Sequence, residues 1–156
     1  MKYISTLFLT ILSLQIMAQK EINTSITINA TPEKVWKILT DYDAYPDWNP
    51  FLSLMEGDFE KGNKVKIVAG GMTFKPIILN IDDKKEIRWK GKFLIKGLFD
   101  GEHILRIKNN NDGTITFHQE EIFTGLLVGL FSKKLDNETK PGFEEMNLKL
   151  KELAEK

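Results

Sequence analysis

A hydrophobic period of two residues, running from about residue 51 to residue 123, most strongly constrains this fold. Six successive segments alternate apolar and polar side chains, as strands with one buried face do. They are FLSLMEG, NKVKIVAG, MTFKPIILNI, KEIRWKGKF, GEHILRIKN and GTITFHQEEIF. Short turn segments such as EKGN, AGG, DDKK and NNNDG separate most of them, and such short connections require antiparallel neighbours. Together with EINTSITIN near the N-terminus, they predict about seven strands in an antiparallel meander.

A short helix is predicted directly after the first strand, over ATPEKVWKIL. Thr31 suits the N-cap and Pro32 the first helical position. Val35, Trp36 and Leu39 would form the apolar stripe of this helix. The segment that follows, TDYDAYPDWNPF, is rich in Asp, Pro and aromatic residues, which predicts a compact turn or a short helical bend.

The last thirty residues predict a long amphipathic helix. Its apolar face would contain residues spaced by three and four positions: Leu135, Thr139, Phe143, Met146, Leu150 and Leu153. Pro141 and Gly142 indicate either one bent helix or a short helix followed by a long one. A twisted sheet curls, and one helix cannot fill its whole concave side. We therefore expect an α+β fold, with the curved sheet wrapped on the C-terminal helix and a cavity between them.

Composition argues against several classes of function. The chain has 22 Lys and Arg and 22 Asp and Glu residues, so no net charge favours nucleic acid as a partner. It has no Cys and two His, which argues against thiol catalysis, disulfides and zinc sites. Gly97, Gly101 and Gly125 lack the flanking pattern of a phosphate-binding loop, and we expect them at bends or bulges of the sheet. No cofactor or metal is expected.

Residues 1–18 have the pattern of a secretory signal peptide. Lys2 precedes an apolar segment from Ile4 to Met17, and Ala18 is a small residue before a possible cleavage site. The apolar segment is short for a membrane span, although an uncleaved N-terminal anchor is the alternative. This pattern predicts an exported protein whose residues 19–156 form a single domain.

The order of these segments resembles the START-like superfamily, also called SRPBCC or helix-grip proteins, and in particular its polyketide cyclase/dehydrase-like members. The resemblance is carried by TPEKVWKILTDYDAYPDWNPF, IRWKGKF, GLFDGEH, EIFTGLL and GFEEMNLKLKE. It covers the chain after the signal segment and implies the helix-grip fold. It implies no single activity, because the superfamily includes binders, transfer proteins, cyclases and chaperone-associated modules.

The most informative polar residues lie in the hairpin GEHILRIKNNNDGTITFHQEEIF. A turn that places Lys108 roughly opposite Thr114 brings His103 across from Gln119 or Glu121. Because strand side chains alternate between faces, these three polar residues would share one face of the sheet.

Phe117 lies on that same face, which predicts that the face is the concave one. Burial of an unpaired carboxylate is costly, so we expect Glu121 either to pair with His103 or to have a raised pKa. Such a pair could transfer protons or bind a polar group of a ligand, or it could simply fix the strand register. A shift by one residue would instead turn His118 and Glu120 inward.

Aromatic and aliphatic residues would form the remaining cavity wall. We expect Trp48 either at the rim of the cavity mouth or at the end of the core. Trp36 is expected in the core. Trp89 would belong either to the cavity wall or to the core. The catalytic candidates are His103 and Glu121. The predicted ligand-binding residues are Trp48, Trp89, Phe93, His103, Leu105, Phe117, Gln119, Glu121, Phe123, Leu127, Phe131, Phe143, Met146 and Leu150.

The segment FTGLLVGLFSKKL has no acidic residue and no histidine. It is too short for a membrane span and is predicted to connect the last strand to the C-terminal helix. Leu126, Leu127, Leu130 and Phe131 would then lie over the cavity entrance, where they could also contact a membrane surface weakly.

Three classes of function remain open. The first is a monomeric carrier or binder of a hydrophobic small molecule or lipid. The second is an enzyme, similar to a polyketide cyclase or dehydratase, that uses His103 and Glu121 for proton transfer. The third is a protein-interaction module, against which the predicted export argues.

Overall fold

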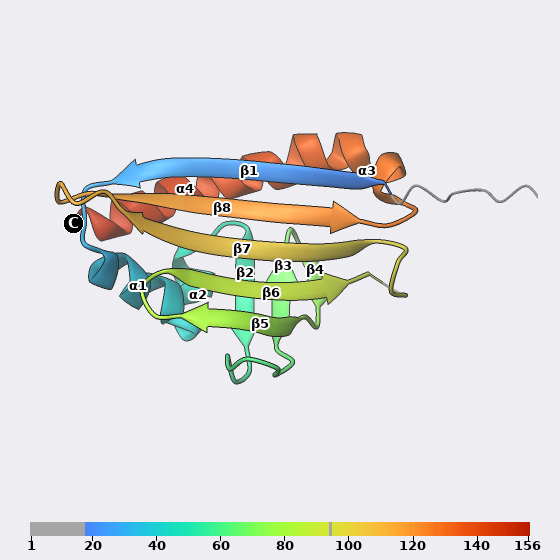
Figure 1. The fold of residues 1–156 in the computed structure, drawn as a ribbon, viewed down its shortest axis with the longest axis horizontal. Coiled ribbons are helices and arrows are strands. Elements are labelled where there is room, and N and C mark those ends of the chain that lie inside the picture. The colour runs from blue at the N-terminus through green and yellow to red at the C-terminus, as the bar shows by residue number, and fades with distance from the viewer. Residues whose placement is uncertain (1–17, 94) are drawn as a thin grey trace, which may run out of the picture.

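In the described part of the chain, eight strands form two antiparallel sheets (Figure 1). The larger sheet has the order β1–β8–β7–β6–β5, and the smaller one has the order β2–β3–β4. The strands are β1 Gln19–Ile28, β2 Leu52–Glu56, β3 Lys66–Ala69, β4 Met72–Phe74, β5 Ile77–Asp82, β6 Glu86–Lys92, β7 Asp100–Asn109 and β8 Ile115–Thr124. This computed structural model describes residues 18–93 and 95–156, so the predicted signal segment lies outside the described residues except for Ala18.

The predicted α+β fold, a curved antiparallel sheet with a long C-terminal helix, is confirmed. The structure has eight strands in two sheets rather than about seven in one, because the segment MTFKPIILNI contains two strands. Proline has no N–H to donate to a strand ladder, and the pairing changes at Pro76, between β4 and β5. The carbonyl of Pro76 still accepts a hydrogen bond from the Val65 N–H at 3.1 Å. A single bridge between Lys64 and Ile77 adjoins this bond, so the chain passes here from the smaller sheet to the larger one.

The predicted first helix is confirmed as α1, Pro32–Thr40, with the Thr31 side chain accepting a hydrogen bond from the N–H of Lys34. A 3-10 turn, Tyr42–Ala44, and the one-turn helix α2, Tyr45–Trp48, follow it. Asn49 ends this bend, because its Oδ1 accepts hydrogen bonds from the next two free N–H groups, those of residues 51 and 52. The predicted short helical bend is therefore present.

The C-terminal helical region is a short helix followed by a long one. Helix α3, Val128–Lys134, continues through a π-helical turn, Leu135–Thr139, into α4, Lys140–Ala154. The N–H of Lys140 donates to the carbonyl of Leu135, five residues back, which is the bond that defines a π-helix. Pro141 lies in the first turn of α4, directly after the π-helical turn. Because the helix is continuous here, the missing N–H of Pro141 removes one of its hydrogen bonds, as is common where a helix is distorted.

Helix α4 packs against β1 and α1 and fills one end of the concave face of the larger sheet. Met146, Leu150 and Ala154 of this helix join the main core cluster, together with Leu105 and Phe117 of the sheet. At the opposite end, β6 and β8 finish and β7 begins, and the helix there is the π-helical turn and α3 (Figure 1). No helix in the described part of the chain is long and apolar enough to cross a membrane.

Candidate functional site

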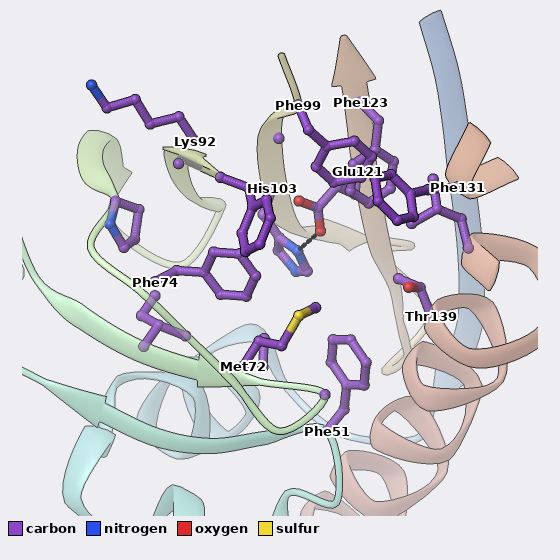
Figure 2. Close-up of a pocket in the computed structure, with 18 of the residues that line it drawn as sticks. Phe51, Met72, Phe74, Lys92, Phe99, His103, Glu121, Phe123, Phe131 and Thr139 are labelled. Carbon is purple, nitrogen blue, oxygen red and sulfur yellow. Dashed lines mark hydrogen bonds and ion pairs between the residues drawn. The ribbon is translucent and has the colours of Figure 1, made fainter. Parts of the chain in front are cut away.

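A cavity of about 190 Å³ lies at this second end of the sheet (Figure 2). Its walls come from the smaller sheet, from β6, β7 and β8, and from the helical segment that joins α3 to α4. Most of the side chains that line it are apolar. The lining residues are Phe51, Leu52, Ile67, Ala69, Gly70, Met72, Phe74, Pro76, Trp89, Gly91, Lys92, Phe93, Phe99, Gly101, His103, Glu121, Phe123, Phe131, Lys134, Leu135, Glu138 and Thr139.

Strand register places the polar residues of the cavity in one cross-strand row. Trp89 on β6 is opposite His103 on β7, and His103 is opposite Glu121 on β8. The rings of Trp89 and His103 are stacked, with centroids 4.5 Å apart and planes 3° apart. On the other side, Nδ1 of His103 lies 2.7 Å from Oε2 of Glu121 (Figure 2). The row thus holds a histidine between an aromatic face and a carboxylate.

His103 is 3% exposed, because neighbouring side chains contact its imidazole ring on several sides. The edge of the ring meets Phe143, with centroids 5.0 Å apart and an angle of 74°. Its Nε2 lies 3.3 Å from the side-chain nitrogen of Gln119, which also contacts Sδ of Met146 at 3.4 Å. The imidazole is therefore held from both sides. Both residues line the cavity, and Glu121, whose side chain is 16% exposed, is the more accessible member of the pair.

Two glycines next to this row leave room for the cavity. Gly91 on β6 is opposite Gly101 on β7, and both line it. A side chain on Gly101 would place its Cβ 2.5 Å from Oε1 of Glu121, so the carboxylate occupies the space that a side chain would fill. The prediction that Gly101 lies at a bend or bulge was wrong, because β7 pairs regularly through this residue.

Several exposed residues mark the mouth of the cavity. Met72 and Phe93 are 45% and 38% exposed although both contribute to the lining. On the helical side, Lys134 forms an ion pair with Glu138 at 3.6 Å. The side chain of Lys92 extends away from the cavity (Figure 2). The mouth is therefore a mixture of apolar surface and lysine side chains.

The structure places six of the predicted ligand-binding residues in the cavity wall: Trp89, Phe93, His103, Glu121, Phe123 and Phe131. The others lie outside the wall: Trp48, Leu105, Phe117, Gln119, Leu127, Phe143, Met146 and Leu150. Most of this second group is fully buried where α4 packs directly on the sheet, which leaves no space there. Trp48 instead packs on the core beside Tyr45, with ring centroids 5.1 Å apart.

The connecting segment after β8 only partly matches its prediction. Phe131 lines the cavity, and its ring meets Phe99 edge-on with centroids 5.4 Å apart. Leu127 donates its N–H to the carbonyl of Leu98 and does not line the cavity. Leu126 and Leu130 are 52% and 76% exposed. Contact of these leucines with a membrane surface stays a prediction.

Sequence reasoning missed the wall formed by the smaller sheet and by Phe51 and Phe99. It also missed Gly91 and Gly101, although a glycine inside a strand pattern often marks a close approach of other groups. Among the described residues, no group of three His, Asp or Glu side chains is placed to hold a metal ion. What the site offers chemically is one hydrogen-bonded imidazole–carboxylate pair in an apolar cavity.

The sequence matches, over residues 19–155, the family described as polyketide cyclase/dehydrase and lipid transport. The chain belongs to this family. Membership confirms the predicted START-like assignment. The match starts at the residue that follows the predicted signal segment and covers all eight strands and the C-terminal helices.

Solved structures agree with this family at the level of the fold. A hypothetical protein from Helicobacter pylori has a TM-score of 0.75 at 12% identity, over 86% of this chain and 88% of that one. A point mutant of norcoclaurine synthase from Thalictrum flavum, in complex with a transition state analogue, has a TM-score of 0.68 at 11% identity, over 88% of this chain and 95% of that one. A START superfamily protein from Mycobacterium smegmatis has a TM-score of 0.63 at 17% identity, over 85% and 98%. No curated protein sequence matches the chain significantly.

Proposed function

We propose that this family member binds a small hydrophobic molecule in the cavity between its two sheets and the α3–α4 segment. The observation that carries the proposal is the mostly apolar wall around about 190 Å³ of space. Ligand sites are concave and mainly apolar, with a few polar groups that orient the ligand. Glu121, with His103 behind it, would supply those polar groups.

Native mass spectrometry of the purified protein after incubation with lipid and metabolite extracts tests this proposal. We expect a bound mass that is released on denaturation and can then be identified. Ala69 lines the cavity, so Ala69→Phe should reduce the space and remove the bound mass. Ser53→Phe is the matched control, because Ser53 is an exposed residue of β2 in the same small sheet. Retention of the mass by Ala69→Phe would contradict the proposal.

A second candidate function is catalysis, and the His103–Glu121 hydrogen bond of 2.7 Å inside the cavity favours it. A paired imidazole and carboxylate can transfer a proton to or from a bound substrate. One protein of similar fold is a synthase by name, norcoclaurine synthase, although the likeness concerns the fold alone.

The molecule recovered from the cavity would serve as the test substrate for this second function. We expect His103→Gln and Glu121→Gln each to abolish its conversion while the thermal midpoint stays nearly unchanged. If both variants convert the molecule at the wild-type rate, the pair is not catalytic. If both unfold at room temperature, its role is structural.

A further inference from the structure

The orientation of one buried amide determines the proton positions in the polar row. Gln119 is fully buried, and its nitrogen donates to Sδ of Met146 at 3.4 Å. The same nitrogen faces Nε2 of His103 at 3.3 Å. With the amide in this orientation, its nitrogen donates and Nε2 accepts, which places the ring proton on Nδ1. Oε1 of Gln119 then has no hydrogen-bond partner among the described residues.

With its proton on Nδ1, His103 donates to Glu121, whose Oε2 lies 2.7 Å away. Glu121 is then an acceptor-only carboxylate. Its second oxygen, Oε1, lies beside Gly101 in the cavity wall, and no described residue donates a hydrogen bond to it. The Glu121 side chain is 16% exposed and lines the cavity, so Oε1 is free to accept a hydrogen bond from a ligand that donates one.

The lysines near the cavity mouth do not offset the negative charge of Glu121 inside the cavity. Lys134 is paired with Glu138, and Lys92 extends away from the cavity (Figure 2). Inside the cavity, an anionic ligand would therefore meet the negative charge of Glu121, whereas a ligand with a hydroxyl or amino group could donate to Oε1.

The size and the wall of the cavity restrict the rest of the ligand. About 190 Å³ exceeds the roughly 150 Å³ of an engineered cavity that binds benzene and is below the roughly 300–1,000 Å³ of drug-sized sites. Rings surround the space, among them Phe51, Phe74, Phe99 and Phe123. A planar ligand of one or two rings matches both the volume and the aromatic wall.

We propose that this cavity selects neutral molecules of one or two aromatic rings that carry a hydroxyl or amino group, and that this group donates to Oε1 of Glu121. This inference rests on the proposed binding function and adds a ligand class to it. It also assigns a specificity-determining atom, the Glu121 oxygen that His103 leaves free.

Three probes with one ring skeleton test the inference: 2-naphthol, naphthalene and 2-naphthoate, titrated into the full chain by calorimetry at neutral pH. We expect 2-naphthol to bind at least about ten-fold more tightly than naphthalene, as a hydrogen bond to a charged acceptor implies. We expect 2-naphthoate to bind more weakly than 2-naphthol, because its charge repels that of Glu121.

Glu121→Gln should change this order of affinities. The oxygen of the new amide would accept from Nδ1 of His103, and its nitrogen would then donate into the cavity. We expect the variant to lose the preference for 2-naphthol and to bind 2-naphthoate more tightly than the wild type does. Glu120→Gln is the matched control, because Glu120 lies on the opposite face of β8, paired with Arg106 at 2.6 Å. It should leave the order of affinities unchanged.

The outcomes separate this inference from the binding function. Equal affinity for 2-naphthol and naphthalene, or tighter binding of 2-naphthoate by the wild type, would overturn the donor preference and leave the binding function in place. Binding of none of the three probes would overturn the donor inference, and the binding function would also fail if extracts yield no bound mass. An unchanged preference in Glu121→Gln would remove Glu121 as its source.

Discussion

The imidazole of His103 lies parallel to the indole of Trp89, with 4.5 Å between ring centroids and 3° between planes. This stack and the hydrogen bond to Glu121 hold His103 from two sides, so the free oxygen of the carboxylate has a fixed position in the cavity. The arrangement follows from the sequence through strand register, because the three residues are direct cross-strand neighbours.

Replacement of Trp89 should show how much this stack contributes to stability. Trp89 is 6% exposed, so Trp89→Ala should lower the free energy of unfolding by about 3–5 kcal/mol. Trp89→Phe keeps an aromatic face against His103 and should lower the free energy of unfolding clearly less than Trp89→Ala does. Chemical denaturation of both variants measures the difference. Equal losses would show that the stacked face itself contributes nothing.

Gly101→Ala should disturb the carboxylate directly, because the added Cβ would lie 2.5 Å from Oε1 of Glu121. We expect loss of the preference for 2-naphthol over naphthalene and a decrease in stability of about 1–3 kcal/mol, as for other overpacked sites. Gly91→Ala is the control for stability alone, since Gly91 also lines the cavity but its Cβ would meet Pro76 at an ordinary distance of 3.6 Å. A 2-naphthol preference that survives in Gly101→Ala would argue against the assigned role of Oε1.

Gly142 allows close packing of α4 against the ring of Phe51. A Cβ at residue 142 would overlap this ring, which also packs edge-on against Phe143 with centroids 5.2 Å apart. Gly142→Ala should therefore lower the free energy of unfolding by about 1–3 kcal/mol, despite the better helix propensity of alanine. In α3, a Cβ at residue 129 would meet no atom within 4 Å. Gly129→Ala should therefore raise the free energy of unfolding by up to about 1 kcal/mol. Thermal unfolding distinguishes these opposite signs.

Glu86 lies on the outer face of the larger sheet. Burial acts to raise the pKa of Glu86, but hydrogen bonds from Arg88, Asn80 and Arg106 together hold it below its ordinary value. A lowered folded-state pKa means that the charged form stabilises the fold above the unfolded-state pKa of about 4.3. This stabilisation is lost as the pH falls through the folded-state value.

Glu86→Gln should therefore lower the free energy of unfolding at pH 7 by about 1–3 kcal/mol, and the difference from wild type should shrink below about pH 4. Urea unfolding of both proteins at several pH values measures this difference in the free energy of unfolding. Glu56→Gln is the control, because its ion pair with Lys66 leaves the glutamate side chain 62% exposed and should change stability by less than about 1 kcal/mol. A difference for Glu86→Gln that does not depend on pH would contradict the assigned cause.

Local patterns predicted much of the fold, because each depends on short-range chemistry. The N-cap at Thr31, the bend ended by Asn49 and the alternation that puts His103 and Glu121 on one face all follow from neighbouring residues. The hairpin register was only approximate, because Lys108 is opposite Thr116 rather than Thr114. Asn109 and Ile115 form the last pair of the hairpin, so the turn lies one residue further along the chain than predicted.

The boundary of the cavity could not be predicted in the same way. Which concave residues face empty space depends on where α4 comes close to the sheet, and the helix residues Phe143 and Leu150 occupy that volume completely. The change of sheet at Pro76 likewise depends on pairing with residues 63–65, which lie far from it in the meander. Contacts between distant elements, which no local pattern encodes, decided both features.

The π-helical turn, Leu135–Thr139, makes the width of the cavity sensitive to the length of the chain. A π-helical turn holds one more residue than an α-helical turn, so removal of one residue here would restore a continuous α-helix. Each residue of an α-helix corresponds to about 100° of rotation. Helix α3 would then turn by that angle relative to α4 and carry Phe131 out of the wall. One insertion or deletion in this turn is therefore a simple route by which relatives could acquire wider or narrower binding sites.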